Sequence, residues 1–286
     1  MKPKHEGGYS PIYAQECERT LVTLLRGLGP WREAVYLIGG LVPRYLVGSG
    51  HVGTSDVDLL CDPESFGQVE AYRNFEKNLE RCGFQRQRSE EGRRQNFSWT
   101  RELDSGHPII LDLLCPATMP YPKLVQPLEG NRQLSALRLE GGHLVLRDFV
   151  EVKVEAELLD GSGESSALVR VAGYTSFLTL KALSYEDRRE EKDAYDIIYC
   201  LTRSTLGPEE LGRVYGANLK AWELDASMVK AVSVLRERFK THRTEGCVSY
   251  ARFLSQVSDS RANAVRSQEA AAAVAEFLEG VEQSST

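Results

Sequence analysis

The sequence lacks an apolar run long enough to cross a membrane, and its first residues lack the apolar core of a signal peptide. It also lacks any Cys-x-x-Cys pair, because its six cysteines are scattered along the chain. This scatter excludes a clustered zinc site and a disulfide framework. We therefore expect a cytoplasmic protein without membrane contact, whose cysteines are reduced and mostly buried.

The chain has no excess of positive charge, since 35 lysines and arginines stand against 41 aspartates and glutamates and the formal net charge is −6. That value argues against a basic surface over the whole chain but not against a local basic patch. No internal repeat is present, and the only low-complexity stretch, Ala270 to Ala273, suits a helix. With 286 residues, the chain is long enough for one large domain or two ordinary ones.

The most informative stretch begins with the apolar run Val35 to Ile38, continues through Gly39 and Gly40, and reaches Asp56 and Asp58 on a second apolar run. Residues two apart in a strand share a face, so the two aspartates project together. Their repulsion is relieved by a cation such as Mg²⁺, which takes one or two carboxylates plus phosphate oxygens. Glycines before a short helix allow a phosphate to approach the backbone. The alternative is a glycine turn followed by two solvated aspartates.

These residues resemble the nucleotidyltransferase superfamily related to DNA polymerase beta, which carries an apolar residue, Gly, Gly or Ser, a spacer and Asp-x-Asp. The resemblance implies that Asp56 and Asp58 bind Mg²⁺ and that Gly39 and Gly40 hold the triphosphate of an NTP. It also implies a third metal-binding carboxylate on a later strand. Asp112, inside the apolar segment 108–116, is the candidate, and it would also assist deprotonation of the attacking hydroxyl. The alternative is an aspartate at a strand edge.

Helical spacing predicts a helix from Ser10-Pro11 to Gly29-Pro30 and another that ends at Gly83. A hairpin is expected over 84–100 around Gly92, and a second one around Gly141-Gly142. Alternation predicts strands over 149–159 and 168–171, with the side chains of Val150, Val152, Val154, Ala156 and Leu158 facing the core.

Turn residues become rare after Gly173, and helical periodicity takes over. We therefore expect an α+β fold with two domains. The first, 1–172, would be a nucleotidyltransferase α/β core with a mixed sheet. The second, 173–286, would be a helical domain that completes the nucleotide cleft.

A second charged pattern opens the helical half, where Lys181, Arg188, Lys192 and Asp196 are spaced by seven, four and four. One helix face could carry all four, unless Asp187 to Arg189 divides the segment into two helices. From the spacing alone, a solvated face with salt bridges is the simpler interpretation.

The same segment is similar to the Lys, Arg and Arg/Lys-Asp-x-x-Asp signature of AbiEii and MenT-like nucleotidyltransferases, toxins of type IV toxin–antitoxin systems. The resemblance implies that Lys181 and Arg188 bind the nucleotide, and that Lys181 and Asp193 are catalytic. His51, Thr54 and Asp56 also resemble the stretch before the Asp-x-Asp of that family. The resemblance implies transfer of NMP from an NTP to an RNA acceptor, such as a tRNA 3′ end, with Mg²⁺ as cofactor and a cognate antitoxin as partner.

Two alternatives remain from the sequence. The enzyme could modify a small molecule, as aminoglycoside nucleotidyltransferases do, or the chain could be a catalytically silent nucleotide-binding regulatory module. An RNA acceptor would need a local basic track, for which the arginines around Gly92 and the run from Arg236 to Arg243 are candidates. A small cationic acceptor would need an acidic pocket, for which Glu186, Asp187, Glu190 and Glu191 are candidates.

Overall fold

The computed structural model describes residues 6–48, 50–62, 69–88, 94–104, 107–117, 125–127, 135–255 and 260–285. The chain forms two compact units. The sheet unit comprises Ser10–Val42 and Gly53–Ala172, and the helical unit comprises Met1–Tyr9, Pro43–Val52 and Gly173–Thr286. The chain therefore changes from one unit to the other between Ala172 and Gly173, while two short N-terminal stretches group with the C-terminal helices.

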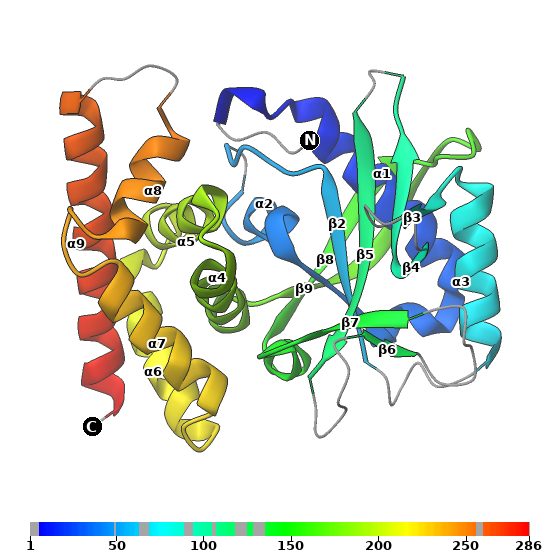
Figure 1. Cartoon of the computed structure of the whole chain (residues 1–286). Helices are drawn as coiled ribbons and strands as arrows, with labels where there is room; N and C mark the ends of the chain where they lie inside the picture. Colours follow the sequence, from blue (N-terminus) through cyan, green and yellow to red (C-terminus); the bar gives the residue numbers. More distant parts are fainter. Residues whose placement is uncertain are drawn as a thin grey trace. The chain divides into compact units, whose positions relative to one another are not determined.

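One mixed sheet forms the sheet unit, with nine strands among the described residues (Figure 1). Seven strands follow the order β3-β4-β5-β2-β1-β9-β8, and β7 pairs with both β5 and β6. Parallel pairing joins β2 to β5, β1 to β9 and β5 to β7, and the other pairs are antiparallel. The strands are β1 (Val35–Ile38), β2 (Asp56–Cys61), β3 (Gln85–Arg88), β4 (Arg94–Glu102), β5 (Pro108–Pro116), β6 (Val125–Pro127), β7 (Ser135–Leu139), β8 (Phe149–Glu157) and β9 (Glu164–Ala172).

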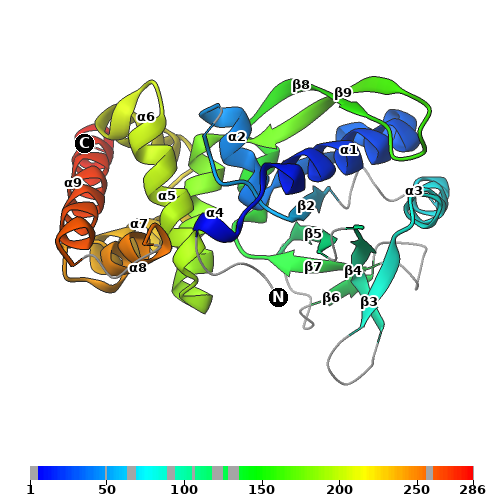
Figure 2. The same ribbon diagram turned by 90° about the horizontal axis from the view of Figure 1, so that it is seen from above.

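Helix α1 (Pro11–Leu28) begins and ends where the sequence predicts. The Ser10 hydroxyl caps it by accepting a hydrogen bond from the Ile12 backbone N–H at 3.4 Å, and Gly29 ends it with φ 56°. The helix crosses one face of the sheet (Figure 2), and Glu16 accepts a hydrogen bond from Arg101 of β4 at 3.1 Å. Further along α1, Arg19 donates to the Glu157 carbonyl at the end of β8.

The side chains that α1 faces form the apolar side of the sheet. Arg101 and Trp99 are two apart on β4, Trp99 pairs with Leu111 of β5, and Leu111 pairs with Val57 of β2. Trp99, Leu111 and Val57 are all at most 1% exposed. Helix α3 (Val69–Arg81) contacts the same face, because its Glu76 accepts from Arg86, the partner of Trp99 on β3. The opposite face is the one that carries Asp58 and Asp112.

The first predicted hairpin is confirmed by the antiparallel pair β3 and β4, although its turn at Gly92 lies outside the described residues. The second is wrong, because β7 is followed not by a returning strand but by the 3₁₀ helix η4 (Gly142–Leu146). A Cβ added at Gly142 would lie 3.0 Å from Leu60 Cδ1 and 3.2 Å from Pro116 Cα. The segment therefore packs closely on the sheet in place of extending it.

The hairpin of β8 and β9 is confirmed, but its predicted inward face is only partly buried. Val154 is 4% exposed and Leu158 is 7% exposed, whereas Val150 is 41% exposed. The contacts of Arg19 of α1 with β8 are at its Glu157 end, away from Val150. All six cysteines are reduced and five are buried, as expected.

The helical unit consists of helices packed around a buried apolar centre, and it confirms the expected α+β arrangement of a mixed sheet followed by C-terminal helices. Arg189 adopts a left-handed conformation with φ 54° and divides the charged segment into two helices. None of the helices in the part of the chain that the structure describes is long and apolar enough to span a membrane. The main helices are α4 (Tyr174–Arg188), α5 (Glu191–Arg203), α6 (Gly207–Ala221), α7 (Ala226–Arg238), α8 (Glu245–Phe253) and α9 (Ser260–Ser285).

Helices α6 and α9 approach each other so closely that only glycine fits at their contact. A Cβ on Gly212 would lie 2.0 Å from the Phe277 carbonyl oxygen, and one on Gly280 would lie 2.0 Å from the Glu209 carbonyl oxygen. Backbone atoms cannot move aside as a flexible side chain can, so these glycines set the spacing of the two helices.

Candidate active site

Asp58 and Asp112 are direct neighbours in the sheet. They are paired residues of the parallel strands β2 and β5, so their Cα atoms are about one strand spacing, ~4.8 Å, apart. Both side chains are on the face opposite α1, because Val57 and Leu111 point to the other side. Each aspartate is half-buried, while the residues that alternate with them are buried. The sequence predicted that both lie on strands, and the register brings them together.

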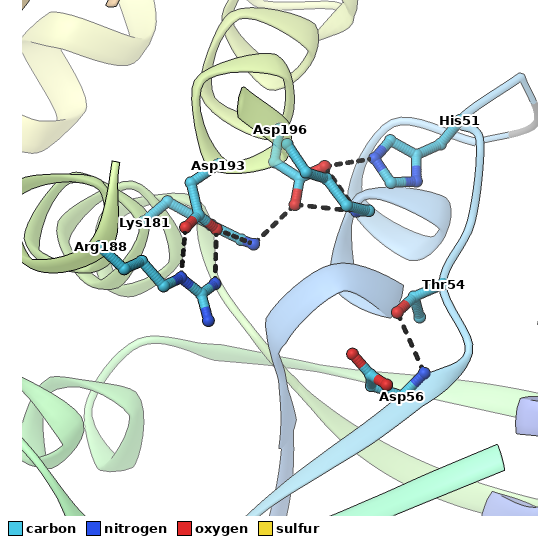
Figure 3. Close-up of polar contacts among 8 residues, drawn as sticks. His51, Thr54, Asp56, Lys181, Arg188, Asp193 and Asp196 are labelled. Carbon is cyan, nitrogen blue, oxygen red and sulfur yellow. Dashed lines mark hydrogen bonds and ion pairs between the residues drawn. The ribbon is translucent and has the colours of Figure 1, made fainter. Parts of the chain in front are cut away.

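Asp56 lies two residues before Asp58 on the same strand face, but its partner on β5 is Ile110, not a carboxylate. Its backbone N–H donates to the Thr54 hydroxyl at 3.1 Å (Figure 3), and the Ser55 hydroxyl donates to its Oδ1 at 3.4 Å. These contacts fix the turn by which the chain enters β2.

Gly39 makes room for the Asp58 carboxylate. It follows Ile38, which pairs with Asp58 across β1 and β2, and it adopts φ +76°, which favours glycine. A Cβ at this position would lie 1.8 Å from Asp58 Oδ2. The sequence pattern explained Gly39 by phosphate binding, and the structure adds a second reason that does not depend on a ligand. Gly40 is buried in the single turn η3 (Gly39–Leu41) that precedes the five-residue helix α2 (Val42–Leu46).

Cys17 lies behind the aspartates and is inert. Burial raises the pKa of its thiol, and the negative charges of Asp56 and Asp58 raise it further. The thiol donates to the Thr54 carbonyl at 3.5 Å. A thiol with a raised pKa stays protonated, so Cys17 is not a nucleophile.

The donor set of this face fits Mg²⁺ in part. Two adjacent carboxylates are the hard oxygen ligands that Mg²⁺ prefers, and Mg²⁺ commonly takes one or two of them together with substrate phosphate oxygens. No group of three His, Cys, Asp or Glu side chains gathers at one point within the described ranges. A magnesium site here would therefore rest on Asp58 and Asp112, and a metal-binding role for Asp56 stays a prediction.

A separate cluster of ion pairs lies within the helical unit, and we call it the Lys181 cluster (Figure 3). The Lys181 ammonium group contacts Asp193 Oδ1 at 2.8 Å and Asp196 Oδ2 at 2.6 Å. Arg188 donates two hydrogen bonds to Asp193, from Nε at 2.7 Å and from Nη2 at 2.9 Å. Lys192 donates to both Asp196 oxygens, at 3.0 and 3.1 Å.

His51 completes the Lys181 cluster from the stretch before β2. Its Nε2 donates to Asp196 Oδ1 at 2.8 Å, and its ring contacts Tyr195 and Tyr199 at centroid distances of 5.3 and 5.0 Å. Sequence reasoning noted His51 but gave it no partner. The spacing between His51 and Asp56 was the only sign that His51 has a role. That spacing does not indicate a contact with Asp196, which is 145 residues further along the chain.

Burial and neighbouring charges set the protonation states in this cluster. Burial alone would raise the pKa values of Asp193 and Asp196, but Lys181 and its neighbouring cations hold both below the usual range. Burial lowers the pKa of His51, and the Asp196 carboxylate offsets this only in part. His51 is therefore neutral and the two aspartates are charged at neutral pH.

The predicted phosphate-binding cations differ in exposure. The Lys181 side chain is 8% exposed and is held by two carboxylates, whereas the Arg188 side chain is 52% exposed. The structure thus brings together Lys181, Arg188, Lys192 and Asp196, which the spacing placed on one helix face, but it does so on two helices and with Asp193 among them. Among them, Arg188 has the more accessible charge.

Several cations of the predicted basic tracks already contact carboxylates. Arg86 contacts Glu76, and Arg236 contacts Glu282 at 2.9 Å. Arg238 makes a two-bond contact with Glu186, at 2.9 and 2.8 Å. Glu186, one of the acidic candidates for a cationic acceptor, also accepts from Arg189, and hydrogen bonds from these two arginines lower its pKa to about 2.

Comparison with known proteins gives little. No protein-family model and no curated protein sequence matches the chain. Among solved structures, the chain is similar to an antigenic nucleotidyltransferase-like protein from Paracoccidioides brasiliensis, with 16% identity and a TM-score of 0.36. The match covers 75% of this chain and 93% of that chain. Since this similarity is too distant to assign an activity, the function must follow from the side chains themselves.

Proposed function

We propose that this chain is a metal-dependent nucleotidyltransferase, in which an acceptor hydroxyl attacks the α-phosphate of an NTP, takes up NMP and releases pyrophosphate. The observation that carries the proposal is the side-by-side placement of Asp58 and Asp112 on one sheet face, with Gly39 making room for the Asp58 carboxylate. Like charges on neighbouring strands destabilise a sheet. Their retention is accounted for if a divalent cation binds between them.

In the sheet unit, two aspartates and two glycines would bind the metal and the NTP. Asp58 and Asp112 would hold Mg²⁺, which when bound stabilises the attacking and leaving oxygens of a phosphoryl transfer. Asp112 would take the proton of the acceptor hydroxyl. The backbone N–H groups at Gly39 and Gly40 would bind phosphate oxygens, as N–H groups at the start of a helix commonly do.

In the helical unit, Arg188 and Lys181 are the proposed phosphate-binding groups and Asp193 is the carboxylate that orients both. Asp193 holds Arg188 through two parallel hydrogen bonds, a geometry that fixes a guanidinium plane. Because Arg188 is half exposed, a phosphate could approach it without breaking the buried pairs.

We propose an RNA acceptor, such as a tRNA 3′ end, and a role as the toxin of a toxin–antitoxin system. The two motifs that resemble AbiEii and MenT-like enzymes support this choice. The exposed Arg88 at the end of β3 supports it too, because its guanidinium could contact a phosphate of the RNA backbone. Glu186, which a cationic small molecule would need, is already bound by two arginines.

Incorporation of label from each NTP separately into total RNA, purified tRNA and an aminoglycoside tests the proposal. We expect transfer to RNA with Mg²⁺ and none with EDTA. Asp58→Asn and Asp112→Asn should each abolish it, and Asp160→Asn, in an exposed turn, is the matched control. RNA binding should weaken steeply with salt. Transfer to the aminoglycoside alone would contradict the RNA acceptor, and undiminished transfer by Asp58→Asn would contradict the mechanism.

A further inference from the structure

The row that contains Asp58 and Asp112 continues across the sheet with neutral polar groups. Ser98 of β4 is the paired residue of Asp112, so its side chain is on the same face. Ser98 is only 2% exposed, and its hydroxyl donates to Gln87 Oε1 of β3 at 2.6 Å. The row therefore consists of two carboxylates, then a hydroxyl, then an amide.

Gln87 occupies an irregular position in β3. The pairs Gln85–Thr100 and Arg86–Trp99 would place Gln87 opposite Ser98 if the register continued, but the register shifts between Arg86 and Arg88. Such irregularities are common next to active sites, where they redirect a side chain. Gln87 is half-buried, whereas Gln85 and Arg88 on either side of the shift are exposed.

The hydrogen bond from Ser98 decides which end of the Gln87 amide is presented. Since Oε1 accepts from the Ser98 hydroxyl, Nε2 is the end that can donate to a ligand, and it carries two N–H donors. The Cα atoms of Ser98 and Asp112 are about one strand spacing, ~4.8 Å, apart, and the amide lies next to the Ser98 hydroxyl on the same face. A carboxylate and an amide on one face, with a single hydroxyl between them, can each bind one of two oxygens on adjacent carbon atoms.

We infer that Gln87 binds the sugar hydroxyl next to the one that reacts at Asp112, and that Ser98 is the residue that positions Gln87. This inference rests on the proposed nucleotidyl transfer and specifies its acceptor as a vicinal diol. Neither Ser98 nor Gln87 carries charge, so the pair selects a neutral hydroxyl over an ammonium group or a phosphate. Gln87 contacts the acceptor directly, and Ser98 acts only through Gln87.

The test compares two RNA oligonucleotides that differ only at the 3′ terminal sugar, which is ribose in one and 2′-deoxyribose in the other. Both retain the 3′ hydroxyl. Binding is measured by fluorescence anisotropy in EDTA, and transfer by label from an NTP with Mg²⁺. The variants are Gln87→Leu, Ser98→Ala and Ser98→Thr, with Gln85→Leu as control, since Gln85 is the same residue type on the same strand.

We expect the wild-type protein to bind the ribose end about two- to tenfold more tightly, the range of one neutral hydrogen bond. Gln87→Leu and Ser98→Ala should abolish the preference by raising the Kd and the KM for the ribose oligonucleotide only. The KM for NTP should not change. Ser98→Thr keeps the hydroxyl and should restore the preference, and Gln85→Leu should keep it.

Two results separate the inference from the function on which it rests. Equal binding of both oligonucleotides by the wild-type protein, or a preference that survives Gln87→Leu, overturns the inference even if nucleotide transfer occurs. Absence of transfer with every NTP contradicts the proposed function, while the binding arm in EDTA still decides the role of Gln87.

Discussion

At the scale of single residues, Gly39 is under two independent restrictions. Its φ of +76° disfavours any side chain, and its missing Cβ leaves the space that Asp58 Oδ2 occupies. Most glycines in turns are restricted only in the first way. Gly161, in the turn between β8 and β9, has φ +73° and nothing within 4 Å of an added Cβ. The two positions therefore separate backbone strain from steric exclusion.

We expect Gly39→Ala to destabilise the protein more than Gly161→Ala does. A left-handed non-glycine residue costs about 1–2 kcal/mol, which both variants share. Gly39→Ala should lose a further 1–3 kcal/mol or so, the typical cost of forcing extra atoms into a packed site. Urea unfolding of the two variants measures the difference, and equal losses would show that Asp58 moves aside freely.

Lys181 and Arg188 should respond differently to truncation. Lys181→Met leaves two buried carboxylates short of a cation, so we expect a loss of about 3–5 kcal/mol in the free energy of unfolding. Arg188→Ala removes a half-exposed partner and should cost about 1 kcal/mol or less. NTP binding by Arg188→Ala, measured by calorimetry, then reports on phosphate contact without a folding defect. Unchanged NTP affinity would exclude Arg188 from the phosphate site.

The positions of Asp58 and Asp112 on strands could be predicted from sequence, but their neighbours in the sheet could not. Asp58 and Asp112 were identified as strand carboxylates because apolar residues flank them. Their shared register, and the extension of the row to Ser98 and Gln87, depend on pairing between strands that are distant in sequence. Local sequence patterns do not specify which strands become neighbours. The spacing of residues therefore could not predict that these four polar side chains lie side by side.

At the scale of elements, the tight contact between α6 and α9 was also not predictable. The alanine-rich stretch Ala270 to Ala273 indicated a helix, but glycines inside a helix normally indicate only lower helix propensity. In this contact Gly212 and Gly280 are needed because backbone atoms of the facing helix lie within 2.0 Å of where a Cβ would be. The failed hairpin at Gly142 has the same origin, namely close packing of a glycine on a neighbouring element.

We expect Gly280→Ala to destabilise the protein although alanine is the better helix former. The added methyl group would meet the Glu209 carbonyl oxygen, and the helices would have to separate, at a cost of about 1–3 kcal/mol. Gly27→Ala in α1 is the matched control, since its Cβ would meet only the end of the Asn78 side chain, which can rotate away. Thermal unfolding of both variants checks the contrast, and a stabilised Gly280→Ala would contradict it.

At the scale of the whole molecule, His51 should make folding depend on pH near neutrality. Burial lowers the pKa of His51 in the folded protein, so the unfolded chain binds a proton more readily. The contribution of His51 to the free energy of unfolding is therefore fully present above its unfolded pKa of about 6.5, and it is lost as the pH falls below that value. Between pH 7.5 and 5.5 the loss should reach up to about 1.4 kcal/mol.

Urea unfolding at the two pH values checks this dependence. His51→Gln keeps a donor for Asp196 but cannot gain a proton, so its stability should change less between pH 7.5 and 5.5. His107→Gln, at an exposed histidine, is the control. An identical pH dependence in the wild type and His51→Gln would show that His51 titrates alike in both states.

The assembly of the helical unit from three separate stretches has a consequence for synthesis on the ribosome. The last residue of the sheet unit is Ala172, so every strand of that unit has been made before α4 begins. The sheet unit can therefore fold while the helices are still being translated, as N-terminal domains commonly do. Residues 43–52, however, group with the helices, and Leu46 accepts a hydrogen bond from Tyr174 of α4, which is made later. During this part of synthesis the stretch that bears His51 is exposed on the nascent chain. Chaperones can bind it then, because Asp196, its partner in the folded protein, has not yet been translated.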